Sequence, residues 1–286
     1  MGRAALPARI ALACIGLLVG CGRHSEHPEM KHCLASGTTP ESRVQACSAV
    51  IRDENDEHGR FARVGRAHAF AELKRFAEAE ADYAAALGVR PDPFVFAFRS
   101  ALRRSSGDME GAWSDVNEAL RLDPGNAFAL LARAELLGAR GEWLKVIGDY
   151  TIVMKTATDP ELKSLARGGR CWARAVAELD LDAGLADCDR RLREAPDDAN
   201  SYNSRGFLHF RAGRHADAIS DYSRAIELDP SVASSYYVRG LAHGQLGDAN
   251  AADADLQAAL AREPGVVERY RGYGVREITQ GAETKP

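Results

Sequence analysis

The chain has 286 residues, of which 45% are hydrophobic and 27% are charged, and its formal net charge is −4. A chain of this length and composition can bury the cores of one or two globular units. No stretch concentrates Lys and Arg, which argues against nucleic acid as a partner. Alanine is abundant, and Val, Ile and Thr form no strand-like alternation, so the composition predicts an all-helical fold.

The first twenty residues have the pattern of a secretory signal peptide. Two arginines precede an apolar run over residues 10–19 that is too short to span a bilayer. The run ends in Leu-Val-Gly-Cys at 18–21, which resembles the lipobox of bacterial lipoproteins. The resemblance implies a signal peptide over 1–20 and lipid attachment at Cys21. It also implies an anchor in the outer membrane that faces the periplasm, since Gly22 rather than Asp follows the Cys.

The segment 21–32 is polar, contains three histidines and shows no apolar period. This composition predicts a flexible tether between the lipid and the fold. The histidines and the neighbouring Cys33 are residue types that bind zinc or copper. Because Cys33 is expected to be oxidised and the tether solvated, we predict no metal site and no cofactor.

The segment 33–60 has the pattern of a helical hairpin. A run of helix breakers over 36–40 precedes apolar residues on one helical face. Four cysteines remain for an oxidising compartment, and sequence alone permits three pairings of Cys33, Cys47, Cys171 and Cys188. Since Cys33 and Cys47 lie at similar distances from the turn, we expect these two to bridge.

From residue 61 to 266 the chain repeats a unit of about 34 residues. A unit of this period cannot bury its apolar face alone and is stable only when stacked on neighbours. A proline ends each of six units, at Pro91, Pro124, Pro160, Pro196, Pro230 and Pro264. The clearest copy has its marked residues at Tyr202, Gly206, Gly213, Ala218, Tyr222, Ala225 and Pro230, and a shift by 34 gives Tyr236, Gly240, Gly247, Ala252, Leu256, Ala259 and Pro264.

This pattern resembles the tetratricopeptide repeat, a helix-turn-helix unit. Small residues let the two helices approach closely, aromatic residues fill the space between neighbouring pairs, and glycines end the first helices in a left-handed conformation. The resemblance implies an all-α superhelical solenoid of about six repeats over 61–266. A capping helix and tail are expected over 267–286. The unit near 165–198 is the most divergent, and its register is the least defined.

A second pattern runs inside the repeat. Asp precedes the aromatic position of all six second helices, and Arg precedes the small position of five first helices. Because both positions lie about equally far from the turn, the two charges could meet across the helix pair or across the joint with the next unit; we interpret them as structural ion pairs. In the divergent unit Cys171 replaces Arg and Cys188 follows Asp187, so a disulfide is expected to replace the ion pair. The expected pairs are Arg66 with Asp82, Arg99 with Asp115, Arg133 with Asp149, Arg205 with Asp221, and Arg239 with Asp255.

The function that this sequence predicts is binding rather than catalysis. It contains no Gly-rich nucleotide loop, Gly-x-Ser-x-Gly elbow or His-Glu-x-x-His motif, so we expect no enzyme. By resemblance to tetratricopeptide domains, the first helices line a concave groove, which includes His68. Its apolar end, at Phe207, Phe210, Tyr237 and Leu241, could hold a peptide or helix. The expected partner-binding groove is formed by Asn203, Phe207, Phe210, Arg211, Tyr237, Leu241 and Gln245.

We therefore expect an envelope-anchored scaffold or adaptor that gathers protein partners of the cell envelope. An assembly factor for a pilus or secretion complex is the alternative, and the sequence does not separate the two. An enzyme or metal carrier fits less well, since the motifs for either are missing.

Overall fold

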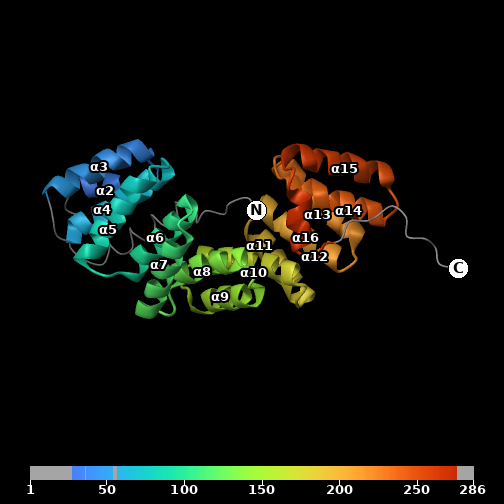
Figure 1. Cartoon of the computed structure of the whole chain (residues 1–286), viewed down its shortest axis with the longest axis horizontal. Coiled ribbons are helices and arrows are strands. Elements are labelled where there is room, and N and C mark those ends of the chain that lie inside the picture. The colour runs from blue at the N-terminus through green and yellow to red at the C-terminus, as the bar shows by residue number, and fades with distance from the viewer. Residues whose placement is uncertain (1–27, 36, 54–56, 276–286) are drawn as a thin grey trace. The chain divides into compact units, whose positions relative to one another are not determined.

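The computed structural model describes residues 28–35, 37–53 and 57–275 (Figure 1). These residues form fifteen helices and no strand, in successive helix-turn-helix pairs, which confirms the predicted fold class. None of the described helices is both long and apolar enough to cross a membrane. The predicted signal peptide, Cys21 and the end of the C-terminal tail lie outside the described residues.

Unit 1 comprises the described residues up to Arg140 together with Lys155–Leu162. Each of its first six helices contacts the next one along the chain, and α6 contacts α8 as well. Asp92, Asp108 and Asn126 cap α6, α7 and α8 by accepting backbone N–H bonds from the first turn. The helices are α2 (Pro28–Cys33), α3 (Pro40–Asp53), α4 (Glu57–Glu72), α5 (Phe76–Val89), α6 (Pro93–Ser106), α7 (Met109–Leu122) and α8 (Ala127–Ala139).

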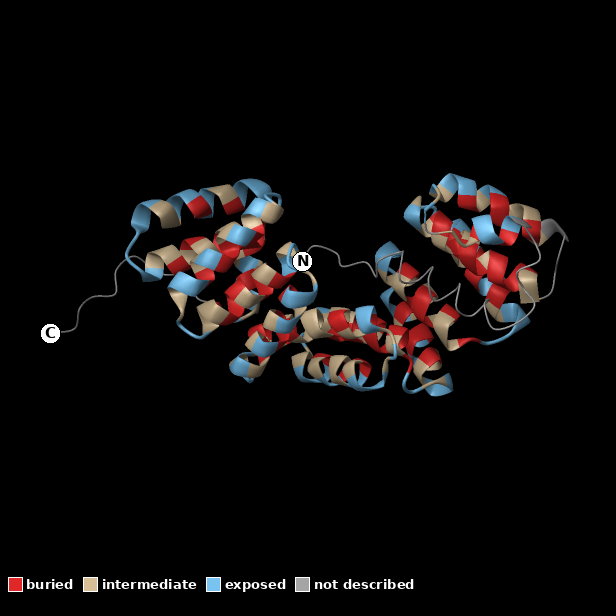
Figure 2. Cartoon of the chain, turned by 180° about the vertical axis from the view of Figure 1, so that it is seen from behind, coloured by how far each residue is buried: buried red, intermediate tan, exposed pale blue. Residues whose placement is uncertain are grey.

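Unit 2 comprises Gly141–Met154 and the described residues from Lys163 onward. The helices α11 to α15 contact one another in chain order, whereas α16 contacts α14. Buried residues lie on the faces that paired helices turn toward each other (Figure 2). The helices are α9 (Trp143–Thr156), α10 (Pro160–Ala177), α11 (Leu181–Glu194), α12 (Ala199–Arg211), α13 (His215–Leu228), α14 (Ala233–Gln245), α15 (Ala249–Arg262) and α16 (Val266–Gly272).

The turn inside each repeat uses a left-handed residue. Glycine takes this conformation in four repeats, with φ of 93° at Gly107, 73° at Gly141, 72° at Gly213 and 83° at Gly247. Lys74 and Glu178 take it in the other two, with φ of 59° and 50°. Glycine adopts this region without the steric cost that other residues bear, so the recurring glycines follow from the turn geometry.

The Arg and Asp pattern forms a two-point contact within the repeat. In each described clamp the Nε and Nη2 atoms of the Arg donate to the two carboxylate oxygens of one Asp, at 2.6–2.8 Å. Bidentate geometry makes this one of the stronger side-chain interactions. Arg133 lies on α8 in unit 1, and Asp149 lies on α9 in unit 2. The clamps join Arg66 to Asp82, Arg99 to Asp115, Arg170 to Asp187, Arg205 to Asp221, and Arg239 to Asp255.

In four of these five clamps the remaining guanidinium nitrogen reaches the preceding helix pair. The Nη1 atom of Arg239 donates to Ser223 Oγ at 3.1 Å, and that of Arg170 donates to Thr151 Oγ1 at 3.0 Å. Each acceptor directly follows the aromatic position of the preceding second helix. One side chain therefore ties three helices together. Of the two arrangements that the sequence left open, these Arg and Asp residues adopt the one across the helix pair, and the bond across the joint goes to a residue outside the pattern. The other two such bonds run from Arg66 to Ser48 at 2.9 Å and from Arg205 to Asp189 at 2.8 Å.

The fourth repeat corrects one expectation. Its disulfide, Cys171–Cys188, does not replace the ion pair, because Arg170 clamps Asp187 with bonds of 2.8 and 2.7 Å. The Arg lies 17 residues before its Asp here, against 16 in the other clamps. Cys171 thus occupies the small position and Cys188 the aromatic position. The disulfide takes the place of the contact between Gly206 and the ring of Tyr222 in the next repeat.

The N-terminal hairpin starts earlier than expected. Cys33 and Cys47 form a disulfide between α2 and α3, but α2 begins at Pro28, so the prediction of a flexible tether as far as residue 32 is wrong. The reason is Met30, which is buried with the disulfide and Val50 in a small core. Gly65 allows α4 to approach this core, because a Cβ atom there would lie 3.1 Å from Cys33 Sγ.

The candidate groove and its occupant

The expected binding residues of unit 2 lie on α12 and α14, and most of them are covered. Phe207 is 0% exposed and Tyr237 is 2% exposed, while Phe210 and Leu241 are partly buried against the same core. The side chain of Asn203 is buried and donates to the hydroxyls of Ser234 and Ser235 at 3.2 and 2.7 Å. Of the seven expected residues, only Gln245 is exposed.

The cover is the C-terminal segment Val266–Val275, which consists of α16 and the turn after it. Tyr270 is 0% exposed, and its ring centroid lies 5.4 Å from those of Phe207 on α12 and Tyr237 on α14. In Figure 1, α16 lies beside α12 and α14. Burial raises the pKa of the Tyr270 phenol, which therefore stays neutral. Phe207 and Tyr237 are thus not open to a partner in this conformation.

The turn after α16 continues across the first helices to α10. Gly274 has a φ of 77°, and the backbone N–H of Val275 donates to the carbonyl of Tyr270 at 3.0 Å, which ends α16. The ring of Tyr273 meets Trp172 on α10 edge-on, with centroids 5.8 Å apart, and Trp143 on α9 with centroids 6.1 Å apart. The segment therefore contacts the first helices of three successive repeats.

Arg211 is the polar member of this site. Its Nη2 atom donates to the backbone carbonyl of Tyr273, its Nη1 atom donates to Glu178, and its guanidinium lies 5.0 Å from the ring centroid of Phe207. The side chain is 8% exposed, and desolvation lowers its pKa against the opposing effect of Glu178. A buried cation thus holds a main-chain carbonyl of the segment.

The equivalent face of unit 1 carries an aromatic row whose rings are also buried, with Phe98 5% and Phe128 3% exposed. The ring of His68 lies 4.6 Å from that of Phe98, and Phe98 lies 5.3 Å from Phe128, so the row runs along α4, α6 and α8. Beside it Arg104 pairs with Glu135 at 2.5 Å. Desolvation raises the pKa of Glu135 although Arg104 opposes the shift.

Three family matches decide what kind of repeat this is. The family described as "Tetratricopeptide repeat" matches residues 62–93 and 233–265, and the one described as "TPR repeat" matches residues 209–247. The chain contains tetratricopeptide repeats. No curated protein sequence matches it significantly.

Solved structures with a similar fold include several tetratricopeptide proteins. One from Parabacteroides merdae is 19% identical, with 82% of this chain and 93% of that chain covered and a TM-score of 0.57. PilW, a type IV pilus biogenesis factor, is 16% identical over 74% of this chain and 98% of its own, with a TM-score of 0.64. Pseudomonas aeruginosa PilF is 15% identical over 78% and 98%, with a TM-score of 0.61. At these identities the likeness shows the fold alone.

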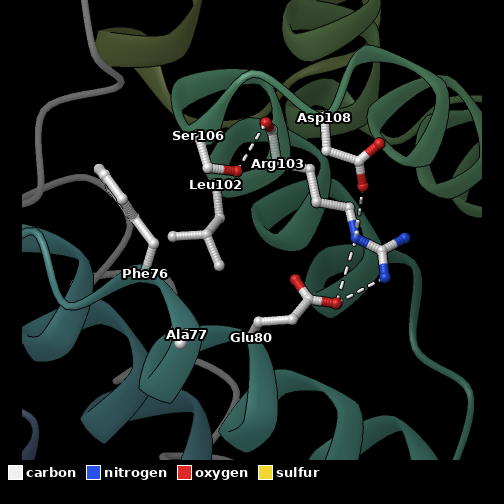
Figure 3. Close-up of a pocket in the computed structure, with 7 residues that line it drawn as sticks. All are labelled: Phe76, Ala77, Glu80, Leu102, Arg103, Ser106 and Asp108. Atoms are coloured by element: carbon white, nitrogen blue, oxygen red, sulfur yellow. Dashed lines mark hydrogen bonds and ion pairs between the residues drawn. The ribbon is translucent and has the colours of Figure 1, made fainter.

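A hollow of about 310 Å³ lies in unit 1 of this tetratricopeptide protein, where α5 begins and α6 ends (Figure 3). Arg103 crosses it, with Nη2 2.5 Å from Glu80 and Nη1 3.0 Å from Asp115. Since these carboxylates already balance the guanidinium charge, we assign no ligand to the hollow. Its lining is Phe76, Ala77, Glu80, Leu102, Arg103, Ser106 and Asp108.

Within the part of the chain that the structure describes, no group of three or more His, Cys, Asp or Glu side chains is placed to bind a metal ion. His24 and His27, considered above as ligands, lie outside that part. His32 is exposed on α2, while Cys33 is in a disulfide.

The buried His68 predicts a loss of stability in mild acid. Burial, with a smaller contribution from Arg43, lowers its pKa to about 3, whereas an unfolded chain has a histidine pKa of about 6.5. Because the folded pKa is the lower one, the stabilisation is complete above pH 6.5 and is lost as the pH falls. Between pH 7 and pH 5 we expect the free energy of unfolding to drop by about 2 kcal/mol from this group.

Urea unfolding at both pH values measures this drop. A His68→Phe variant should lack about 2 kcal/mol of the pH dependence, whereas His32→Phe, a change at an exposed histidine, should keep it. Equal pH dependence in the wild type and His68→Phe would show that protonation of His68 does not oppose folding.

Proposed function

We propose that this tetratricopeptide protein is an envelope-anchored scaffold without catalytic activity, which holds protein partners on the inner faces of its first helices. The observation that carries the proposal is the occupied face of unit 2. There a short chain segment is held by aromatic contacts and by a bond from Arg211 to a main-chain carbonyl. These are the interactions by which a groove binds a peptide.

Capture from the native envelope tests the scaffold. The protein is crosslinked in its own cells, and its partners are identified after purification. A Phe210→Ala, Leu241→Ala double variant changes two partly exposed groove residues and should reduce partner recovery at least tenfold while the melting temperature stays within a few degrees. Leu144→Ala, a change at a 69% exposed residue on α9, is the control. Full recovery with the double variant would place binding elsewhere.

The anchor is proposed from the lipobox at 18–21. Acyl chains stabilise membrane attachment by about 0.8 kcal/mol per buried methylene. A Cys21→Ser variant should therefore leave the membrane fraction and appear in the soluble fraction. If it still sediments with outer membranes, lipid on Cys21 is not the tether.

A pilus or secretion assembly factor is the second candidate. The likeness to PilW and PilF favours it, since both structures share the fold over three quarters of this chain. The same crosslinking experiment separates the two candidates: recovered pilus or secretin subunits support the assembly factor, and recovered cell-wall enzymes support the adaptor.

A further inference from the structure

The segment Val266–Val275, called the C-terminal segment below, does not continue the repeat. A stacked helix would cover the outer face of α15, yet Leu256 and Leu260 there are both 38% exposed. The equivalent residue of the preceding repeat, Tyr222, is fully buried. The chain instead turns at Pro264 and Gly265 and runs along the inner face, so its place is that of a ligand and not of a seventh repeat.

The residues of the C-terminal segment fall into two groups: some are buried against the groove, and others are exposed to solvent. Val266, Tyr270 and Val275 are buried, and Tyr273 packs on Trp172. Glu268 and Arg271 are exposed and pair with each other at 3.4 Å. In a typical interface, a few buried aromatic residues supply most of the binding energy, and the contacts around them contribute little.

The polar contact from the groove, which Arg211 makes, is to the main chain of the C-terminal segment and not to one of its side chains. Arg211 donates to the carbonyl of Tyr273, a group that every peptide offers, and its Nε atom has no hydrogen-bond partner among the described residues. Selectivity must therefore come from the two aromatic positions. Tyr270 lies on α16 and Tyr273 directly after it, three residues apart, and their ring centroids are 5.4 Å apart.

We infer, on the basis of the proposed scaffold function, that the groove of unit 2 recognises a short helical segment with two aromatic residues three positions apart. The C-terminal segment is the chain's own version of this ligand, and a partner peptide binds by displacing it. Because its connection to α15 is short, the C-terminal segment has an effective concentration in the millimolar range at the groove. A partner peptide therefore binds weakly unless its own concentration is as high or its affinity for the groove is greater.

The test keeps every residue of the chain. A specific protease site is inserted between Pro264 and Gly265, and the purified protein is cut there, which removes the tether but not the segment. The probe is a fluorescent synthetic peptide of residues 265–275. We expect it to exchange into the cut protein while helical content and melting temperature are retained, and to bind the uncut protein at least tenfold more weakly.

Two altered peptides test the anchors. Replacement of both tyrosines by alanine should weaken binding at least a hundredfold, whereas the Glu268→Ala peptide, altered at an exposed residue, should bind as the original does. Unfolding of the cut protein, failure of the probe to exchange, or equal binding of the alanine peptide would overturn the inference. A dimer of the cut or uncut protein in light scattering would also overturn it, since the occupant would then be a second copy.

These results are independent of the scaffold proposal. If the probe does not exchange but envelope partners are still captured, only this inference fails. If the probe exchanges but no partner is captured, the groove is a peptide site and the scaffold function fails.

Discussion

An Asp255→Ala substitution is expected to lower the free energy of unfolding by about 3 kcal/mol. Asp255 accepts both bonds of Arg239, at 2.8 and 2.7 Å, and the same guanidinium reaches Ser223 on the preceding repeat. Alanine would leave a cation that is 21% exposed with one remaining bond. The hydrogen bonds that Arg239 donates to Asp255 raise the pKa of Arg239 in the native protein. Because an arginine in a protein stays protonated even without such a partner, deprotonation offers the variant no relief.

Asp253 supplies the matched control for this clamp. It lies two residues earlier on α15 and is exposed, so Asp253→Ala should change the free energy of unfolding by less than about 0.5 kcal/mol. An Arg239→Met, Asp255→Leu double variant should recover at least half of the loss, because no charge is then left unpaired. Urea unfolding at pH 7 measures all three; equal costs for the two single aspartate variants would contradict the role of the clamp.

Replacement of both Cys171 and Cys188 by alanine is expected to cost about 3 kcal/mol, as the crosslink closes a loop of 17 residues and restricts the unfolded chain. Reduction of the wild type should likewise lower the urea concentration at which half of the protein is unfolded. Reduction also opens Cys33–Cys47, so the double variant isolates the bond of unit 2.

A Cys171→Gly, Cys188→Tyr variant separates packing from crosslinking at this position. It recreates the pair of Gly206 and Tyr222, in which a Cβ atom on Gly206 would lie 3.0 Å from the Tyr222 ring. We expect it to be more stable than the alanine pair by about 1 kcal/mol or more, since the ring fills the space that alanine leaves empty. A variant no better than the alanine pair would show that the two repeats do not share this packing position.

The repeat period predicted most of the fold because the same packing problem recurs along the chain. Arg239 and Asp255 could be assigned from their spacing alone, as 16 residues place them level across a helix pair. Arg170 does not follow this spacing, because it lies 17 residues before its Asp in a repeat with a longer first helix, Pro160–Ala177. A spacing of 16 before Asp187 falls on Cys171, which occupies the small position.

The site was harder to predict than the fold. The sequence indicates which residues face the groove, but not that Tyr270 enters it, because residues 266–275 are amphipathic and would suit the end of the repeat equally well. The position of this segment is decided by tertiary contacts with the ring of Phe207 and the guanidinium of Arg211. Such contacts produce no pattern in the sequence of residues 266–275 itself. Met30 is similar, a single buried side chain in a polar stretch.

The uncovered face of α15 also affects whether further repeats can be added at this end of the array. Leu256 and Leu260 keep the apolar character of the positions that pack on a following repeat, although no described helix covers them. A duplicated 34-residue unit added at this end would meet a surface already suited to it, and stability in such arrays is a sum of neighbouring interfaces. The length of the array is therefore open to gene duplication, while the position of the C-terminal segment is fixed by α10, α12 and α14.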